Sequence, residues 1–251
     1  MSILEKALSH SKKIGIDECE IVTVEKKTTT VRITDSEIVE IKQNFDKKYG
    51  IRIIHQKKIV SIQTTDNQNI EKTIDSIFET ISNFKPREFW KGLPYKISAR
   101  KIEGTFDEKL EEISGKNSMD IAQSMINSAD NEKINTITGS LNIVSEDFQL
   151  RNSQGLEFND KATYVSGIIN AESEQGNIPV SGIGHASGRT LSNFSKEQIG
   201  EDAKIMCIES INPQKIESDT YPIIFEPYSV GELLAFVVAS NFNFKTFTEK
   251  K

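Results

Sequence analysis

The side chains best suited to bind a metal or to transfer a proton are few in this sequence. It contains three histidines, His10, His55 and His185. No two of them have the HExxH or HxxxH spacing that places two imidazoles on one face of a helix. His10 and His55 fall at polar positions of an expected helix and strand, so we expect both at the surface. His185 lies in SGIGHASGR, which we expect to be a flexible glycine-rich loop, a kind of segment that can carry function.

Other catalytic motifs are missing as well. The sequence has no GxxxxGK[ST] phosphate loop and no GxSxG turn that would hold a nucleophilic serine. Glu226 and Glu232 resemble an acid–base pair, but Glu232 stands among apolar residues and is better explained as a capping or snorkelling carboxylate. Cys19 and Cys207 lie far apart without a CxxC partner, so we expect buried structural thiols. Spacing alone therefore predicts no catalytic residue and no metal ligand.

Composition and charge narrow the class of protein. Hydrophobic residues make up 36% of the 251 residues and charged residues 27%, which is typical of a soluble globular protein. The net charge of −6 argues against a nucleic-acid partner, because such proteins usually present a basic face. No apolar run is long enough to cross a bilayer, and the first residues, MSILEKALSHSKK, lack the apolar core of a signal peptide. We therefore expect a cytoplasmic protein without a membrane partner.

The first part of the chain has an α+β pattern. Apolar residues recur at helical spacing over 3–14 and again over 67–84. Between them, alternating apolar and polar residues predict five strands of an antiparallel meander, CEIVTVEK, TTVRITD, EIVEIKQN, YGIRIIHQ and KIVSIQTT. The proline-containing stretch 85–96 reads as a linker across the surface. We therefore expect an N-terminal α+β domain over residues 1–95.

The remaining residues, 96–251, predict a second, mixed α/β domain. Helical segments are expected in DEKLEEIS, SMDIAQSMINSAD and 196–211. Residues 136–173 predict three strands, with turns at Ser145–Asp147 and Asn152–Gly155. Tyr221–Phe225 reads as a buried strand that enters a helix at Pro227, a residue favoured in the first helical turn. The alternating Phe242, Phe244 and Phe247 predict a strand without a neighbour, so we expect this domain to be truncated at its C-terminus.

Several short motifs occur along the chain in a recognisable order. They are Tyr49–Ile54 (YGIRII), Asn152–Leu156 (NSQGL), Gly188-Arg189 followed by Ile199–Ala203 (IGEDA), and Tyr221–Phe225 (YPIIF). In this order they resemble the TldD/PmbA family, also called the modulator of DNA gyrase family. A further stretch, KKIVSIQTTD, matches the corresponding family region only loosely. The resemblance extends from the first helix to the end of the chain.

The resemblance implies a cytoplasmic metallopeptidase that forms a dimer around a peptide-sized chamber. In the metal-bearing branch, the helix after the YPII-like strand carries HExxxH. Its histidines bind zinc together with a distant cysteine, and its glutamate activates water. Here the helix has Ala235-Phe236 after the leucine pair, where His-Glu would stand. This departure resembles the PmbA (TldE-like) branch, whose members lack zinc ligands and pair with a zinc-bearing subunit, and whose greater length again implies truncation of this chain.

Two functions remain open at this point. In the first, the chain is the zinc-free subunit of such a peptidase, as a heterodimer with a zinc-bearing subunit or as a homodimer, and holds unstructured peptide. Strands around 141–172 would then accept peptide by strand addition, and the substrate-binding candidates are Asn152, Gly155, His185 and Arg189. The alternative for these residues is structural, with Asn152 and Gly155 building a turn and Arg189 pairing with an acidic neighbour. In the second function, the chain is a scaffold that binds peptides or proteins without proteolysis. A hydrolase that uses Glu226 and Glu232 unaided is the least favoured reading.

Overall fold

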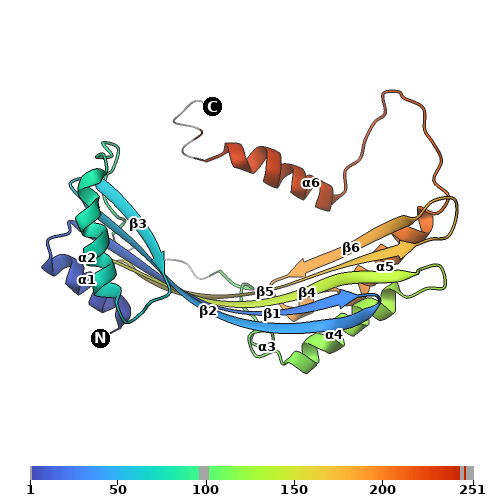
Figure 1. Ribbon diagram of the computed structural model, residues 1–251, viewed down its shortest axis with the longest axis horizontal. Coiled ribbons are helices and arrows are strands. Elements are labelled where there is room, and N and C mark those ends of the chain that lie inside the picture. The colour runs from blue at the N-terminus through green and yellow to red at the C-terminus, as the bar shows by residue number, and fades with distance from the viewer. Residues whose placement is uncertain (1, 96–101, 244–245, 247–251) are drawn as a thin grey trace. The chain divides into compact units, whose positions relative to one another are not determined.

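A single antiparallel sheet organises most of the chain (Figure 1). The computed structural model describes residues 2–95, 102–243 and 246. The strands are β1 (Glu18–Thr34), β2 (Glu37–His55), β3 (Lys58–Thr64), β4 (Thr136–Asn152), β5 (Glu157–Ser173) and β6 (Val180–Gly188). Their order in the sheet is β3-β2-β1-β4-β5-β6, and every neighbouring pair is antiparallel. With the helices below, this confirms the predicted α+β class.

Helices lie before, between and after the strands along the chain. They are α1 (Ile3–Lys13), α2 (Ile70–Thr80), α3 (Glu108–Glu111), α4 (Gly115–Ala129), α5 (Lys196–Glu209) and α6 (Pro227–Leu233), with short 3₁₀ turns at Ile81–Asn83, Leu191–Asn193 and Ala239–Asn241. A π-helical turn, Leu234–Val238, continues α6. No described helix is both long enough and apolar enough to span a bilayer. The chain divides into two compact units, Met1–Pro213, which contains the whole sheet, and Gln214–Lys251, which contains α6.

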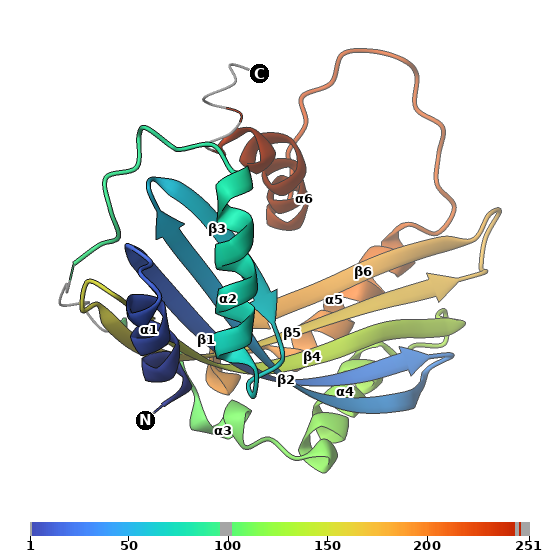
Figure 2. The same cartoon turned by 60° about the vertical axis from the view of Figure 1, so that its left-hand side comes forward.

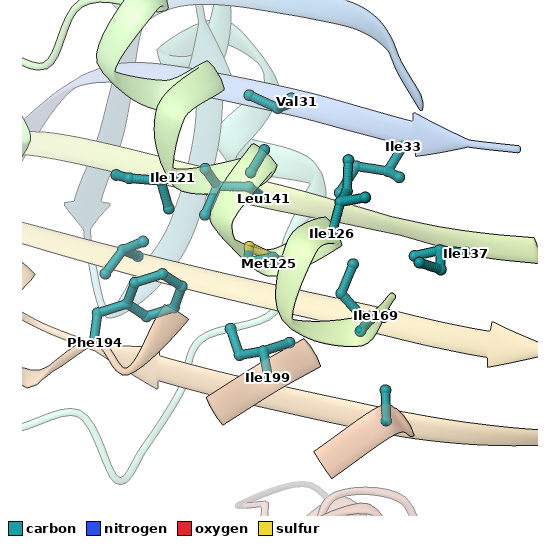
Figure 3. Close-up of a cluster of buried hydrophobic side chains, with 14 of the residues drawn as sticks. Val31, Ile33, Ile121, Met125, Ile126, Ile137, Leu141, Ile169, Phe194 and Ile199 are labelled. Carbon is teal, nitrogen blue, oxygen red and sulfur yellow. The ribbon is translucent and has the colours of Figure 1, made fainter. Parts of the chain in front are cut away.

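One face of the sheet carries two separate hydrophobic cores. Figure 2 shows α1 and α2 at one end of the long strands and α4 and α5 at the other. Odd-numbered residues of β1 face both helix pairs: Cys19 and Ile21 pack in the first core, and Val31 and Ile33 in the second. Figure 3 shows the second core, where Met125 of α4 and Ile199 of α5 meet the strands. Because strand side chains alternate between faces, the even-numbered residues of β1 point to the opposite side.

Helix α1 is fixed at its start by a reciprocal cap. The Ser2 amide donates to Glu5 Oε2 at 2.7 Å, and the Glu5 amide donates to Ser2 Oγ at 3.2 Å. Arg151 of β4 donates from Nη1 to Glu5 Oε1 at 2.8 Å. The Ser2 amide and Arg151 together lower the pKa of the Glu5 carboxyl. The cap and the ion pair together attach the first helix to the sheet.

The predicted five-strand meander is wrong, because only three strands span this region. The stretches around Lys26-Lys27 and Asp46-Lys47 were expected to be turns. Instead the β1–β2 ladder runs through both, with Lys26 opposite Asp46 and Glu25 opposite Lys47. The extended backbone continues through both stretches, and their charged side chains pair across the ladder, as Lys47 does with Glu25. The true hairpin turns use Asp35 and Ser36, and Gln56 and Lys57, all with positive φ.

The second part differs from its prediction in the same way. Residues 136–173 form two strands instead of three, because Ser145–Asp147 stays in the β4–β5 ladder. The expected loop over SGIGHASG is wrong as well, since residues 180–188 form strand β6. Its glycines suggested flexibility but serve close packing. A Cβ on Gly184 would lie 1.8 Å from the Ile199 carbonyl oxygen of α5.

In the unit Gln214–Lys251, only the predicted helix is found in the structure. A helix does begin at Pro227, as predicted. Tyr221–Phe225 is not a strand, and Ile224 in it is 97% exposed. Of the expected phenylalanine strand, Phe242 lies in a bend after the 3₁₀ turn, while Phe244 and Phe247 lie outside the described residues. The division into domains 1–95 and 96–251 stays a prediction, as does truncation at the C-terminus.

Candidate functional site

Asn152 and Gly155 build the turn between β4 and β5. Asn152 is 3% exposed, and its Oδ1 accepts hydrogen bonds from the Gln154 amide at 2.9 Å and the Leu156 amide at 3.0 Å. Its Nδ2 donates to the Pro94 carbonyl at 2.9 Å. Gly155 has φ of 82°, a conformation that glycine adopts without strain. These contacts use the Asn152 side chain structurally, as the alternative reading expected.

The same turn holds the segment that precedes residue 96. Glu18, at the start of β1, accepts hydrogen bonds from Trp90 Nε1 at 2.7 Å and from the Leu93 amide at 2.9 Å. Gln154 Nε2 donates to the same carboxylate at 3.2 Å. The predicted linker is therefore held against one end of the sheet by Glu18 and Asn152.

His185 and Arg189 lie far from that turn. His185 stands on β6 opposite Ile168 of β5, whereas the Asn152 turn joins the other end of β5. At 3.3 Å per residue, the separation along β5 is roughly 35 Å. Arg189 follows β6, and its guanidinium carbon lies 5.9 Å from the centroid of the Tyr164 ring. The structure therefore places Asn152 and Gly155 in one turn, His185 on β6 and Arg189 just after β6, and does not gather all four.

The sheet has one face that α1, α2, α4 and α5 do not cover, here called the helix-free face. It consists of the even-numbered residues of β1 and their partners in the register, among them Val22, Val24, Lys26, Arg52, Val144, Phe148, Leu150, Phe158, Tyr164, Ile168 and His185. Val144 is buried and His185 is exposed, and the other members just named are neither. It mixes apolar and polar rows: Gly50, Val22, Leu150 and Phe158 form one apolar row, and Lys42, Thr30, Asn142 and Ser166 form one polar row. Such a surface suits contact with an extended chain better than contact with a charged polymer.

A cationic cluster lies in the middle of the helix-free face. Lys26 Nζ is 5.6 Å from the centroid of the Tyr164 ring, and Arg189 approaches the same ring. Hydrogen bonding with Tyr164 raises the pKa of Lys26, and nearby Glu146 and Asp46 add to the effect. Two cations beside one phenol ring are suited to hold a carboxylate. We call Lys26, Tyr164 and Arg189 the tyrosine cluster. Lys26 and Tyr164 were missed by the sequence analysis, because nothing local distinguishes them from solvated strand residues.

A cavity of about 310 Å³ opens near one edge of the same face. Its lining includes Val22, Gly50, Arg52 and Gln63. Gly50 leaves it open, because a Cβ there would meet only the Val22 side chain, at 3.9 Å. Arg52 closes one side, through an ion pair with Glu20 and a stacking contact with Trp90 at 6.0 Å. The YGIRII motif therefore lines a cavity with both its glycine and its arginine.

A second cavity, of about 360 Å³, lies among charged residues on the strands and α3. Lys161 donates to Glu111 Oε1 at 2.8 Å, Lys27 donates to the Glu111 carbonyl at 2.9 Å, and Lys47 pairs with Glu25. Two of its carboxylates, those of Glu111 and Glu25, are thus already bound to lysines, and the lining has no excess of one charge. We assign it no ligand.

The described residues do not fit a zinc site. The described part of the chain contains no cluster of three or more His, Cys, Asp or Glu side chains placed to hold a metal. His10 Nε2 lies 2.6 Å from Asp75 Oδ1, and His55 Nδ1 lies 3.3 Å from Asp17 Oδ1, so these histidines, expected at the surface, are part-buried carboxylate partners. His185 lies on β6. The segment from Pro227 to Val238 is helical but has Ala235 and Phe236 where the resemblance would require ligands.

Both cysteines are buried and packed in the two cores, as predicted. Burial raises the pKa of the Cys19 thiol to about 11, and that of Cys207 in the same direction. Since the thiolate is the reactive form, we expect neither thiol of the folded chain to react with iodoacetamide at pH 8 within an hour. Intact mass measured before and after unfolding in urea tests this. Two adducts in urea and none without it are expected, and rapid modification of Cys19 in the native chain would contradict it.

The chain is similar to one known protein family and to several solved structures. Residues 19–83, from β1 to the end of α2, match the family described as PmbA/TldA metallopeptidase domain 1. TldE from Thermococcus kodakarensis has a similar structure, with a TM-score of 0.87 and 18% identity over 99% of this chain and 57% of that one. A proposed modulator of DNA gyrase from Bacteroides thetaiotaomicron has a TM-score of 0.81 and 16% identity over 93% of this chain and 55% of that one. Another, from Thermotoga maritima, has a TM-score of 0.75 and 21% identity over 86% of this chain and 50% of that one. No curated protein matches the sequence.

The sheet and helices define an α+β protein, and its residues 19–83 match a domain of a metallopeptidase family. Through residues 19–83 the chain is similar to the first domain of the TldD/PmbA family, as the motifs indicated. The solved structures are all less than 25% identical, so they show the fold alone. The chain spans about half of their length.

Proposed function

We propose that this chain is the zinc-free subunit of a cytoplasmic TldD/PmbA-type metallopeptidase, where it completes a chamber that holds unstructured peptide. The observation that carries the proposal is the helix beginning at Pro227, which has Ala235-Phe236 in place of the family's metal ligands. Its partner would be a zinc-bearing subunit of the same family. When bound there, zinc polarises the scissile carbonyl and lowers the pKa of water. This chain would bind and orient the peptide.

The helix-free face supports a peptide-binding role. Helices α1, α2, α4 and α5 do not cover it, most of the members named above are half-buried, and it includes the tyrosine cluster and the Gly50 cavity. A peptide carboxylate would bind between Lys26 and Arg189, and apolar side chains would contact residues such as Phe148 and Ile168. Strand addition at 141–172 is not supported, because β4 lies between β1 and β5 and most of β5 is paired on both sides. Only Glu157–Tyr164 of β5 lacks a β6 partner among the described residues.

The proposal predicts that peptide cleavage requires two different chains. We expect no hydrolysis of a fluorescent unfolded casein by this chain alone. Adding the zinc-bearing subunit should produce hydrolysis that a chelator abolishes and zinc restores. Tight casein binding without cleavage in the mixture would contradict the proposal and favour the scaffold function. Cleavage by the isolated chain that survives chelation would contradict it in favour of Glu226 and Glu232.

The tyrosine cluster supplies a matched pair of variants for the same assay. Arg189→Ala should raise KM for casein about tenfold with little change in kcat, because it removes ground-state binding of a carboxylate. Lys6→Ala is the control, since Lys6 is an exposed cation of α1, which packs on the other face of the sheet. Equal KM values for the two variants would remove the cluster from the proposed site.

A further inference from the structure

The Gly50 cavity lies over β1, β2 and β3 on the helix-free face. Two neighbouring rows of the sheet line it, and they are Glu20-Arg52-Ser61 and Val22-Gly50-Gln63. The rows are two residues apart along each strand, which is roughly 7 Å. Because glycine has no side chain, Gly50 leaves a hollow in the middle of the second row. The cavity therefore has a polar row beside a row with an open centre.

The ion pair of Glu20 and Arg52 leaves hydrogen-bonding atoms unused. Arg52 donates from Nη2 to Glu20 Oε1. The Glu20 side chain is only 10% exposed, yet in the described part of the chain no group donates to its second oxygen, Oε2. Among the described residues, Arg52 Nε is likewise buried without an acceptor. Since a buried polar atom without a partner is costly, the pair is incomplete without a further donor and a further acceptor.

The opposite side of the cavity also has polar groups available for a ligand. Ser61 and Gln63 are exposed, and neither side chain has a hydrogen-bond partner within the described residues. Both belong to β3, the edge strand of the sheet. A hydroxyl and an amide can each donate and accept a hydrogen bond. The cavity thus offers donors and acceptors on two sides and the apolar Val22 on a third.

The charges around the cavity favour a neutral ligand. Glu20 contributes one negative charge and Arg52 one positive charge, and the other lining residues are uncharged. A carboxylate that approached Arg52 would also meet the unmatched oxygen of Glu20, which repels it. An ammonium group that approached Glu20 would meet the guanidinium of Arg52 in the same way. A neutral group that carries both an N–H donor and a carbonyl acceptor avoids both repulsions.

We propose that the Gly50 cavity binds a primary carboxamide, the head group of a glutamine side chain in a bound peptide. The amide nitrogen would donate to Glu20 Oε2, and the amide oxygen would accept from the Arg52 guanidinium. The aliphatic stem would lie over Gly50, between Val22 and Gln63. The inference rests on the proposed function for the peptide as the source of the amide, and it adds the kind of side chain that the peptide presents.

Blocked tripeptides test this selectivity on the full 251-residue chain without a zinc-bearing subunit. The probes are acetyl-glycyl-X-glycine N-methylamides, which have no terminal charge and no primary carboxamide outside X. Trp90, the one tryptophan of the sequence, reports binding, because its ring centroid lies 6.0 Å from the Arg52 guanidinium carbon. With X as glutamine we expect binding about tenfold tighter than with glutamate, lysine or norleucine, since only the amide satisfies both partners.

This measurement is separate from the cleavage assay. Selective binding without cleavage in the two-chain mixture would refute the peptidase role and keep the carboxamide site. Cleavage in the mixture with no preference for the glutamine peptide would keep the peptidase role and refute the site. Saturation-transfer NMR of the same probes measures binding independently of Trp90.

Glu20→Gln tests the role of the carboxylate. The variant keeps the size of the side chain but leaves Arg52 without its counter-charge, so the glutamate peptide should now bind more tightly than the glutamine peptide. A loss of structure would weaken all the probes alike and would not invert the preference. Glu25→Gln is the matched control, because Glu25 lies on the same strand, points to the other face and pairs with Lys47. It should keep the glutamine preference.

Gly50→Leu is a second variant that fills the hollow. A Cβ at this position meets only the Val22 side chain, at 3.9 Å, so the sheet can accommodate a side chain there. We expect this variant to lose glutamine binding and to keep the circular dichroism of the wild type. Free L-glutamine separates the two sources of a carboxamide, and tighter binding of it than of the peptide would overturn the peptide source. Equal binding of all four peptides, or an unchanged preference in Glu20→Gln, would overturn the proposal.

Discussion

Replacing Gly184 by alanine is expected to destabilise the chain by about 3 kcal/mol or more. The new Cβ would lie 1.8 Å from the Ile199 carbonyl oxygen and 2.8 Å from the Ala203 amide nitrogen. Both atoms belong to the backbone of α5 and cannot rotate away. Strand β6 and helix α5 would have to separate, which would open the core around Ile199. Urea denaturation followed by circular dichroism measures the loss.

Gly50→Ala is the matched control for that experiment. It adds the same methyl group to the same sheet, but the nearest atom within 4 Å is the Val22 Cβ at 3.9 Å, an ordinary contact. We expect its effect to stay within about 1 kcal/mol, with stabilisation from the restricted unfolded chain. An equal loss of unfolding free energy in the two variants would contradict the close approach of β6 to α5.

Asn152→Ala should produce the second large effect, a loss of about 3 kcal/mol. The substitution leaves the amides of Gln154 and Leu156 and the carbonyl of Pro94 without the partner that the buried side chain supplies. Trp90 is the chain's one tryptophan and donates to Glu18 beside this turn. Its fluorescence should therefore shift to the red before the sheet unfolds, because the held segment detaches first.

Asn159→Ala on β5 is the control for the turn. Asn159 is exposed and lies in the ladder opposite Gln149, so its removal should change the free energy of unfolding by no more than about 0.5 kcal/mol. If Asn152→Ala unfolds with the wild-type midpoint and keeps the wild-type Trp90 emission, the structural role of Asn152 is refuted.

The sequence predicts which segments are strands and helices better than where strands end. Alternation was recognised in the short segments CEIVTVEK, TTVRITD, EIVEIKQN and YGIRIIHQ, but the polar residues between them were interpreted as turns. In the structure these charges face other strands, as Lys47 does with Glu25. Alternation indicates the side-chain period of a strand but does not predict where the strand ends. Gly182 and Gly184 were interpreted as part of a flexible loop. Their actual role, close packing against α5, depends on a helix that follows later in the chain.

The candidate site was less predictable than the fold. Asn152 and Gly155 were placed in a turn because asparagine and glycine mark turns locally. The tyrosine cluster joins Lys26 of β1, Tyr164 of β5 and Arg189 after β6, which only the sheet order brings together. No local pattern indicates such a cluster. The absence of HExxxH, in contrast, can be read directly from the sequence.

Native mass spectrometry of the complex isolated from its own cells tests the central claim most directly. The proposed zinc-free role predicts that the chain is found with a second, different subunit, and that dissociation leaves zinc on that subunit and none on this chain. Zinc retained by this chain after dissociation would contradict the account. So would a complex that contains no metal-bearing partner.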